Sequence, residues 1–104
     1  IYERVQPLFL MKLLVIYDIS RNDMRIKVMN RLFSKGFKRI NLSGYLGEFN
    51  RNDFDPLLYS LKPYVSDEDD SIYAVPIEES EIKRVRIIES SRIRSFTEED
   101  TAVI

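Results

Sequence analysis

Apolar residues along this chain recur with the period of strands in some segments and with the period of helices in others. The first strong signal is Leu13–Tyr17, five consecutive apolar or aromatic residues, a run typical of a strand covered on both faces. The clearest helical spacing begins at Phe54 and repeats every three or four residues. The pattern predicts strands over about 12–18, 38–42, 45–49, 72–77 and 84–88, and helices over about 22–35 and 54–65.

This order, β-α-β-β-α-β with one additional C-terminal strand, predicts an α+β fold, a ferredoxin-like sandwich. Two helices on one face of a small sheet leave its other face apolar. We therefore expect a homodimer that covers this face, with the fifth strand adding to the partner's sheet edge. Residues 11–88 form the predicted domain, 1–10 are read as an upstream extension or a cloning remnant, and 89–104 as a polar tail that we expect to be mobile.

Short polar signals predict how the elements begin, turn and end. Ser20 or Asn22 is the expected N-cap of the first helix, and Asn50 or Asn52 that of the second. The glycines at 44 and 47 predict a bulge or sharp bend in the middle of the chain. The acidic run 67–70 is expected to be a turn.

Two residue types are missing, and their absence narrows the chemistry. The 104 residues include no cysteine, which excludes disulfides and thiolate metal sites and favours an intracellular, cytoplasmic protein. They include no histidine, which removes the usual general base and every Ser-His arrangement. No apolar run approaches the length of a membrane-spanning helix, so we expect no membrane association.

The net charge of −1 hides strong segregation of charge along the chain. Residues 48–70 hold seven acids against two cations, whereas residues 21–39 hold seven cations against one acid. Three of these cations lie four apart on one helix face, and such a stripe favours contact with the phosphates of RNA or DNA. A solvated helix face is the alternative, and the alternating Arg84 and Arg86 are a possible second patch. The candidate nucleic-acid-binding residues are Arg21, Arg25, Lys27, Arg31, Lys35, Lys38 and Arg39.

Asp18 is the candidate functional-site residue, because it ends the first predicted strand just before a helix. Side chains in such positions are held rigidly yet reach solvent. The alternative is that Asp18 caps the helix or accepts backbone hydrogen bonds. Ser20 and Ser43 are possible phosphate or water ligands but are more typical of turns, and Tyr17 and Tyr45 either stack on bases or belong to the core.

Several segments together resemble the CRISPR-associated Cas2 family. They are Leu14-Val15-Ile16-Tyr17-Asp18-Ile19-Ser20, the basic helix, Gly36-Phe37-Lys38-Arg39-Ile40-Asn41-Leu42-Ser43 and the aromatic-x-Gly-Glu segment at 45–48. The resemblance spans about 11–88, and the order and spacing of its motifs carry it. It implies a ferredoxin-like homodimer whose terminal strand packs on the partner subunit, and which joins the Cas1 integrase in acquiring new spacers.

The resemblance also implies a magnesium-dependent endonuclease acting on RNA or DNA, with Asp18 as the catalytic and metal-binding residue. Two copies of Asp18 facing each other in a dimer would approach one Mg²⁺, which needs only one or two carboxylates. One departure stands out, because Leu46 occupies the position of a glutamate in the family's usual motif.

Three other functions remain open at this point. The same dimer could act as a non-catalytic DNA scaffold for the Cas1 integrase. It could be a toxin-type endoribonuclease of the same fold, with no affinity for the integrase. A ligand-binding regulatory domain is the third, since this fold hosts many functions.

Overall fold

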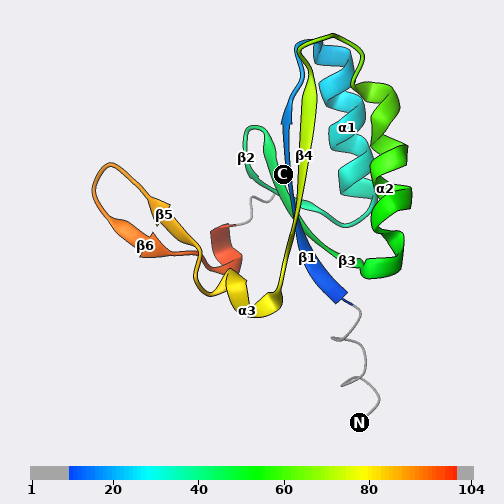
Figure 1. Ribbon diagram of the computed structural model, residues 1–104. Coiled ribbons are helices and arrows are strands. Elements are labelled where there is room, and N and C mark those ends of the chain that lie inside the picture. The colour runs from blue at the N-terminus through cyan, green and yellow to red at the C-terminus, as the bar shows by residue number, and fades with distance from the viewer. Residues whose placement is uncertain (1–9, 101–104) are drawn as a thin grey trace.

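The computed structural model describes residues 10–100 and consists of a four-stranded antiparallel sheet with helices on one face (Figure 1). The strands follow the order β2-β3-β1-β4, so the first strand is central and hydrogen-bonded to both neighbours. This is the strand order of a ferredoxin-like sandwich. The strands are β1 (Leu10–Asp18), β2 (Lys38–Asn41), β3 (Gly44–Asn50) and β4 (Ser71–Ile77).

Two helices, α1 (Asn22–Ser34) and α2 (Phe54–Leu61), cover one face of this sheet (Figure 1). A 3₁₀ helix (Arg51–Asp53) precedes α2, and another (Lys62–Tyr64) follows it. The second helix was predicted to run to 65. It ends at Leu61 because Pro63 has no N–H for the next α-helical hydrogen bond.

The core lies between the sheet and these helices. Leu13, Val15 and Tyr17 alternate along β1 and point toward the helices. The buried hydrophobic residues are Leu13, Val15, Tyr17, Ile19, Val28, Leu32, Phe37, Tyr45, Phe49, Leu57 and Leu61. The other set of β1 residues, Lys12, Leu14, Ile16 and Asp18, therefore lies on the opposite face, which we call the open face.

A C-terminal unit packs against part of the open face. It contains α3 (Glu79–Ile82) and a hairpin of β5 (Arg86–Ile88) and β6 (Ile93–Ser95), followed by a 3₁₀ helix (Glu98–Asp100). Figure 1 shows it on the side of the sheet opposite α1 and α2. An apolar cavity of about 70 Å³ marks the contact; Leu14, Ile40, Leu46, Ile77, Ile82, Val85 and Phe96 line it.

The prediction for this end of the chain was partly wrong. A strand was expected over 84–88, but a turn closed by the hydrogen bond from Val85 N–H to Ile82 O shortens it to β5. Residues 89–104 were expected to be a polar, mobile tail with no strand, and β6 within them pairs with β5. β6 has only three residues, Ile93-Arg94-Ser95, which is too short for a strand period to stand out in the sequence. The extension was predicted over 1–10, but Leu10 is the first residue of β1. Residues 1–9 and 101–104 lie outside the described residues.

The helix caps and the bulge also differ in part from the predicted positions. Arg21, not Ser20 or Asn22, is the N-cap of α1, and its side chain makes no capping hydrogen bond. The register shift in the described β2–β3 pairing lies between Arg39 and Asn41, opposite Tyr45 and Gly44, whereas Gly47 pairs regularly with Leu13. Asn50 does act as a cap, but of the 3₁₀ helix before α2, through Asn52 N–H at 2.8 Å.

The α+β ferredoxin-like fold is thus confirmed, and the turn at 67–70 is closed by the hydrogen bond from Asp70 N–H to Asp67 O. Within residues 10–100, no helix combines the length and the apolar character needed to cross a bilayer.

Candidate functional site

Asp18 is the last residue of β1 and lies directly opposite Ser71 of β4. Its side chain is exposed on the open face, beyond Ile16. Neither a hydrogen bond nor an ion pair joins its carboxylate to another residue between 10 and 100. The alternative roles considered for it, helix cap and acceptor of backbone bonds, are therefore not seen in this part of the chain.

In the part of one chain that the structure describes, Asp18 belongs to no cluster of metal-binding side chains. Residues 10–100 contain no group of three or more His, Cys, Asp or Glu side chains placed to share an ion. Leu46, where the family motif has an acid, lines the apolar cavity under the C-terminal unit. Glu48 faces Lys12, with 3.9 Å between Nζ and Oε2, six residues of β1 away from Asp18. Magnesium fits Asp18 because it retains most of its waters, and it fits better if a second copy adds a carboxylate.

The loop after Asp18 is held by the acidic turn at 67–70. The sequence predicted this turn but not its contact with the loop. Ser20 donates its N–H to Asp70 Oδ1 at 2.9 Å, and its Oγ lies 2.6 Å from Asp67 Oδ2 and 3.0 Å from Asp70 Oδ1. These bonds, led by the Ser20 N–H, lower the pKa of Asp70. Ser20 is thus occupied as an anchor of the loop rather than free as a phosphate ligand.

The two arginines nearest this loop are also engaged. Arg21 forms a two-bond ion pair with Asp23, at 3.1 and 2.7 Å, which lowers the pKa of Asp23. Arg25 donates to the carbonyl oxygens of Ile19 and Ser20 at 2.8 and 3.0 Å. Arg25 is therefore a brace for the backbone that follows Asp18.

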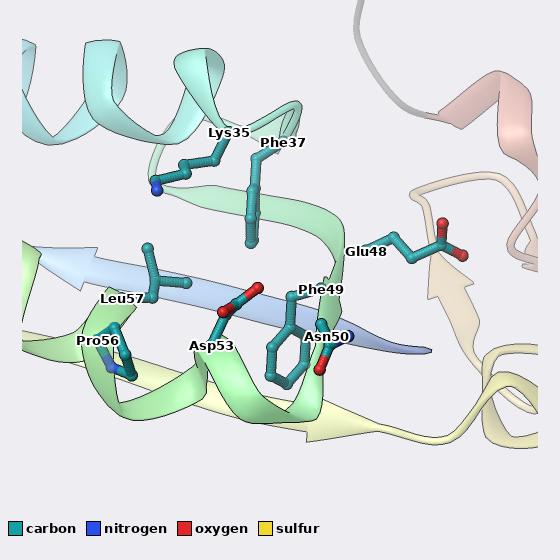
Figure 2. Close-up of a pocket in the computed structure, with 8 residues that line it drawn as sticks. All are labelled: Lys35, Phe37, Glu48, Phe49, Asn50, Asp53, Pro56 and Leu57. Atoms are coloured by element: carbon teal, nitrogen blue, oxygen red, sulfur yellow. The ribbon is translucent and has the colours of Figure 1, made fainter. Parts of the chain in front are cut away.

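Lys27, Arg31 and Lys35, which we call the basic stripe, follow α1 in the helical layer. Lys27 and Lys35 are exposed and Arg31 is half-buried, and none of the three has an ion-pair partner in the described part of the chain. Lys35 ends the stripe at a groove of about 370 Å³, where Figure 2 shows it opposite Asp53. The stripe and Asp18 thus lie on opposite sides of the sheet.

The two predicted contacts on β2 separate in the same way. Lys38 is exposed and pairs with Leu46, so it belongs to the open face. Arg39 points into the helical layer, where Nε donates to the Tyr45 hydroxyl at 3.3 Å and the guanidinium lies 5.6 Å from that ring. The seven predicted cations therefore do not form one surface.

The tyrosines considered for base stacking belong to the core. The rings of Tyr17 and Tyr45 are buried and stack on each other with centroids 5.9 Å apart. Burial raises the pKa of Tyr45, and the hydroxyl of Tyr17 donates to Leu42 O at 3.2 Å.

The possible second basic patch consists of Arg84 and Arg86. Arg84 forms an ion pair with Glu81, and Arg86 donates hydrogen bonds to the carbonyl oxygens of Lys83 and Val85.

A second cavity, of about 320 Å³, lies between the first half of α1 and the turn joining β2 to β3. We call it the arginine cavity, because two arginines line it and no Asp or Glu does. Periodicity did not reveal it, since its walls come from three separate segments. Its lining residues are Tyr17, Asn22, Arg25, Ile26, Met29, Arg39, Leu42 and Ser43.

Comparisons with known proteins identify the family. The model of the family described as CRISPR associated protein Cas2 matches residues 11–85. A protein of Archaeoglobus fulgidus named CRISPR-associated endoribonuclease Cas2 1 is 34% identical over 64 residues, which cover 62% of this chain and 68% of the relative. A crystal structure of cas2 superimposes with a TM-score of 0.53 at 25% identity, covering 66% of this chain and 76% of that one. The chain therefore belongs to the Cas2 family of CRISPR-associated proteins.

Proposed function

We propose that this protein is a metal-dependent CRISPR-associated endonuclease that acts as a homodimer, with Asp18 of each copy holding one Mg²⁺. The observation that carries the proposal is the Asp18 carboxylate itself. It is exposed at the end of the central strand, without a partner among residues 10–100. Other carboxylates close to this end of the sheet, Asp23, Asp67 and Asp70, are engaged by Arg21 or Ser20.

The open face supports the dimer. Ile16, Tyr73 and Val75 are 41%, 64% and 41% exposed and lie on this face, where Ile16 pairs with Tyr73 and Val75 pairs with Leu14. An exposed apolar patch next to a candidate site is typical of an interface. If a second copy covered it by two-fold symmetry, the Asp18 residues at the ends of the two patches would approach each other.

The chemistry suits a chain without histidine. A bound Mg²⁺ would supply a water of lowered pKa and positive charge beside the scissile phosphodiester. The two Asp18 carboxylates would hold the ion, and without it they would repel each other. The hydrogen bonds of Arg25 and Asp70 would keep the backbone after Asp18 in one conformation.

The basic stripe supports nucleic acid as the substrate. Lys27 and Lys35 are exposed, Arg31 is half-buried, and none of the three forms an ion pair within residues 10–100, so their charges are available to a phosphate backbone. The Archaeoglobus relative is named an endoribonuclease, which supports RNA cleavage.

The test is cleavage of labelled single-stranded RNA and duplex DNA by wild type and by Asp18→Asn, with Mg²⁺ or with EDTA. We expect cutting that needs Mg²⁺ and falls by at least about a hundredfold in Asp18→Asn, because one carboxylate per copy is the metal's only protein ligand. Asp55→Asn, which removes an exposed carboxylate from α2, is the matched control and should cut normally. Equal cutting by Asp18→Asn and wild type would contradict the proposal.

A second candidate is a non-catalytic dimeric scaffold that binds DNA and the Cas1 integrase. Leu46 favours it, because this chain has an apolar residue under the C-terminal unit where the family motif has an acid. Binding of duplex DNA and of the integrase without any cutting by wild type would support the scaffold. Cutting of RNA without affinity for the integrase would indicate a toxin-type endoribonuclease instead.

A further inference from the structure

We propose that the arginine cavity binds one nucleotide of the nucleic acid, with the phosphate between Arg25 and Arg39 and the base on the apolar rim. This deepens the proposed function and rests on it for the class of ligand. The cavity and Asp18 lie at the same end of β1, but on opposite faces of the sheet, because Tyr17 lines the cavity and Asp18 points the other way.

The charge of the cavity favours an anion. Two arginines line it and no carboxylate does, and neither arginine has an ion-pair partner within residues 10–100. The groove beside Lys35 is different, because it also contains Glu48 and Asp53. Arginine is well suited to phosphate, which it contacts with a rigid fork of N–H groups.

Both guanidinium groups are held in place before any ligand arrives. Arg25 is fixed by Ile19 O, by Ser20 O and by Asn22 Oδ1 at 3.2 Å. Arg39 is fixed by the Tyr45 hydroxyl and by Met29 Sδ at 3.7 Å. These bonds leave the Nε of Arg25 and one terminal nitrogen of Arg39 without a partner in the described structure. Groups already ordered bind a phosphate at little entropic cost.

The remaining walls suit the rest of a nucleotide. Ile26 and Leu42 are 43% and 84% exposed at the cavity, an apolar surface on which a base would lie. Ser43 and Asn22 add groups that hydrogen-bond to sugar or phosphate oxygens. The volume of about 320 Å³ is near the lower end of the range for small-ligand pockets, about 300 Å³, and suits one nucleotide.

The test is a titration of wild type with 5′-AMP, adenosine and inorganic phosphate in EDTA, followed by NMR of backbone amides and arginine Nε–H groups. We expect 5′-AMP to shift the signals of Arg25, Arg39 and Ser43. It should bind about tenfold more tightly than phosphate alone or adenosine alone, since each lacks half of the contacts. Equal affinity for 5′-AMP and phosphate would overturn the assignment to a nucleotide, and shifts confined to other residues would overturn the site.

Substitutions at the rim provide the decisive comparison. Leu42→Glu places a carboxylate beside the cavity at a side chain with little packing, and should weaken 5′-AMP binding by about tenfold or more. Leu42→Gln is the matched uncharged control and should stay within about threefold of wild type. Arg39→Gln should abolish binding, whereas Lys62→Gln, which removes an exposed cation elsewhere, should not change it.

Failure here is distinguishable from failure of the nuclease proposal. Binding of 5′-AMP that Leu42→Glu weakens, in a protein that cuts nothing, would support the cavity and contradict the nuclease. Metal-dependent cutting by a protein in which Leu42→Glu leaves 5′-AMP affinity unchanged would overturn the cavity alone.

Discussion

Close packing determines which residue is tolerated at Gly47. A Cβ built at Gly47 would lie 2.4 Å from Cγ of Phe37 and within 2.6 Å of both adjacent ring carbons. Phe37 is buried, and it closes the core beyond the end of α1. The glycine therefore serves close packing between β3 and an aromatic ring, rather than the bend that the sequence predicted.

We expect Gly47→Ala to lower the free energy of unfolding by about 1–3 kcal/mol, because the Phe37 ring must move within a packed core. Urea denaturation measures this loss. Gly44→Ala is the control, and it should cost less because its nearest neighbour, at 2.7 Å, is the end of the Asn41 side chain. If the clash is the cause, Gly47→Ala should cost less in a Phe37→Leu background; the same cost in both backgrounds would contradict the explanation.

At the scale of elements, periodicity predicted what faces the core but not which loops meet. The four sheet strands and two main helices were predicted because their apolar spacing is long enough to be distinctive. The bonds from Ser20 to Asp67 and Asp70 span about fifty residues and leave no local pattern. The same holds for the arginine cavity and for β6, whereas Asp18 could be selected because it directly follows an apolar strand.

The C-terminal hairpin should weaken in acid. Asp100 accepts from the Arg94 guanidinium at 3.0 Å and from Thr97 N–H at 2.6 Å. The Arg94 bonds, followed by Thr97, lower the pKa of Asp100 from 3.8 to about 2. A lowered folded-state pKa means that this stabilisation is complete above the unfolded value of 3.8 and is lost as the pH falls through about 2.

Asp100→Asn should reproduce this loss at neutral pH. We expect faster hydrogen exchange of Phe96 N–H, which donates to Val85 O at 3.2 Å between the two ends of the hairpin. Glu99→Gln removes a neighbouring charge that makes no hydrogen bond within the described residues, and should leave this exchange unchanged. An unaltered exchange rate in Asp100→Asn would show that the Arg94 pair does not hold the hairpin.

The basic stripe follows α1 as far as its C-cap, Lys35. We expect it to make the affinity for nucleic acid depend on the salt concentration. We expect Lys27→Glu/Arg31→Glu/Lys35→Glu to abolish measurable binding of duplex DNA or RNA. The single change Lys27→Gln should reduce the slope of log K against log salt by about 0.7–0.9, the amount for one phosphate contact. Fluorescence anisotropy across a salt series measures both. Lys62→Glu/Lys83→Glu, which changes exposed cations off the stripe, is the control; equal effects from both sets would indicate non-specific charge.

At the scale of the whole molecule, the two candidate surfaces face away from each other. One chain has its unengaged carboxylate on the open face and its basic stripe on the helical layer. A dimer formed through the open faces would place the two Asp18 residues inside and the two stripes outside. Nucleic acid bound to the outer stripes would then have to pass an edge of the dimer to reach the carboxylates. If the proposed dimer forms in this way, we expect cleavage to require it and contact with phosphates not to.

The dimer should depend on the exposed apolar residues of β4. We expect Tyr73→Asp/Val75→Asp to convert the protein to monomers in sedimentation velocity, because each change places a charge in the centre of the patch. Tyr59→Asp alters a tyrosine that is 74% exposed on α2, in the helical layer, and should leave the dimer intact. A monomeric wild type, or an unchanged dimer in the double variant, would place the interface elsewhere.

Mixing experiments then decide whether both Asp18 residues serve one site. When wild type and Asp18→Asn are unfolded together and refolded in equal amounts, random pairing leaves about one quarter of dimers with two wild-type copies. If one ion needs both carboxylates, cleavage should fall to about one quarter of an all-wild-type sample, whereas independent sites would leave about one half. The same mixture made with Asp55→Asn should retain full activity. A result of one half would keep Asp18 as the metal ligand but assign a complete site to each copy, and the open face would then cover the site rather than build it.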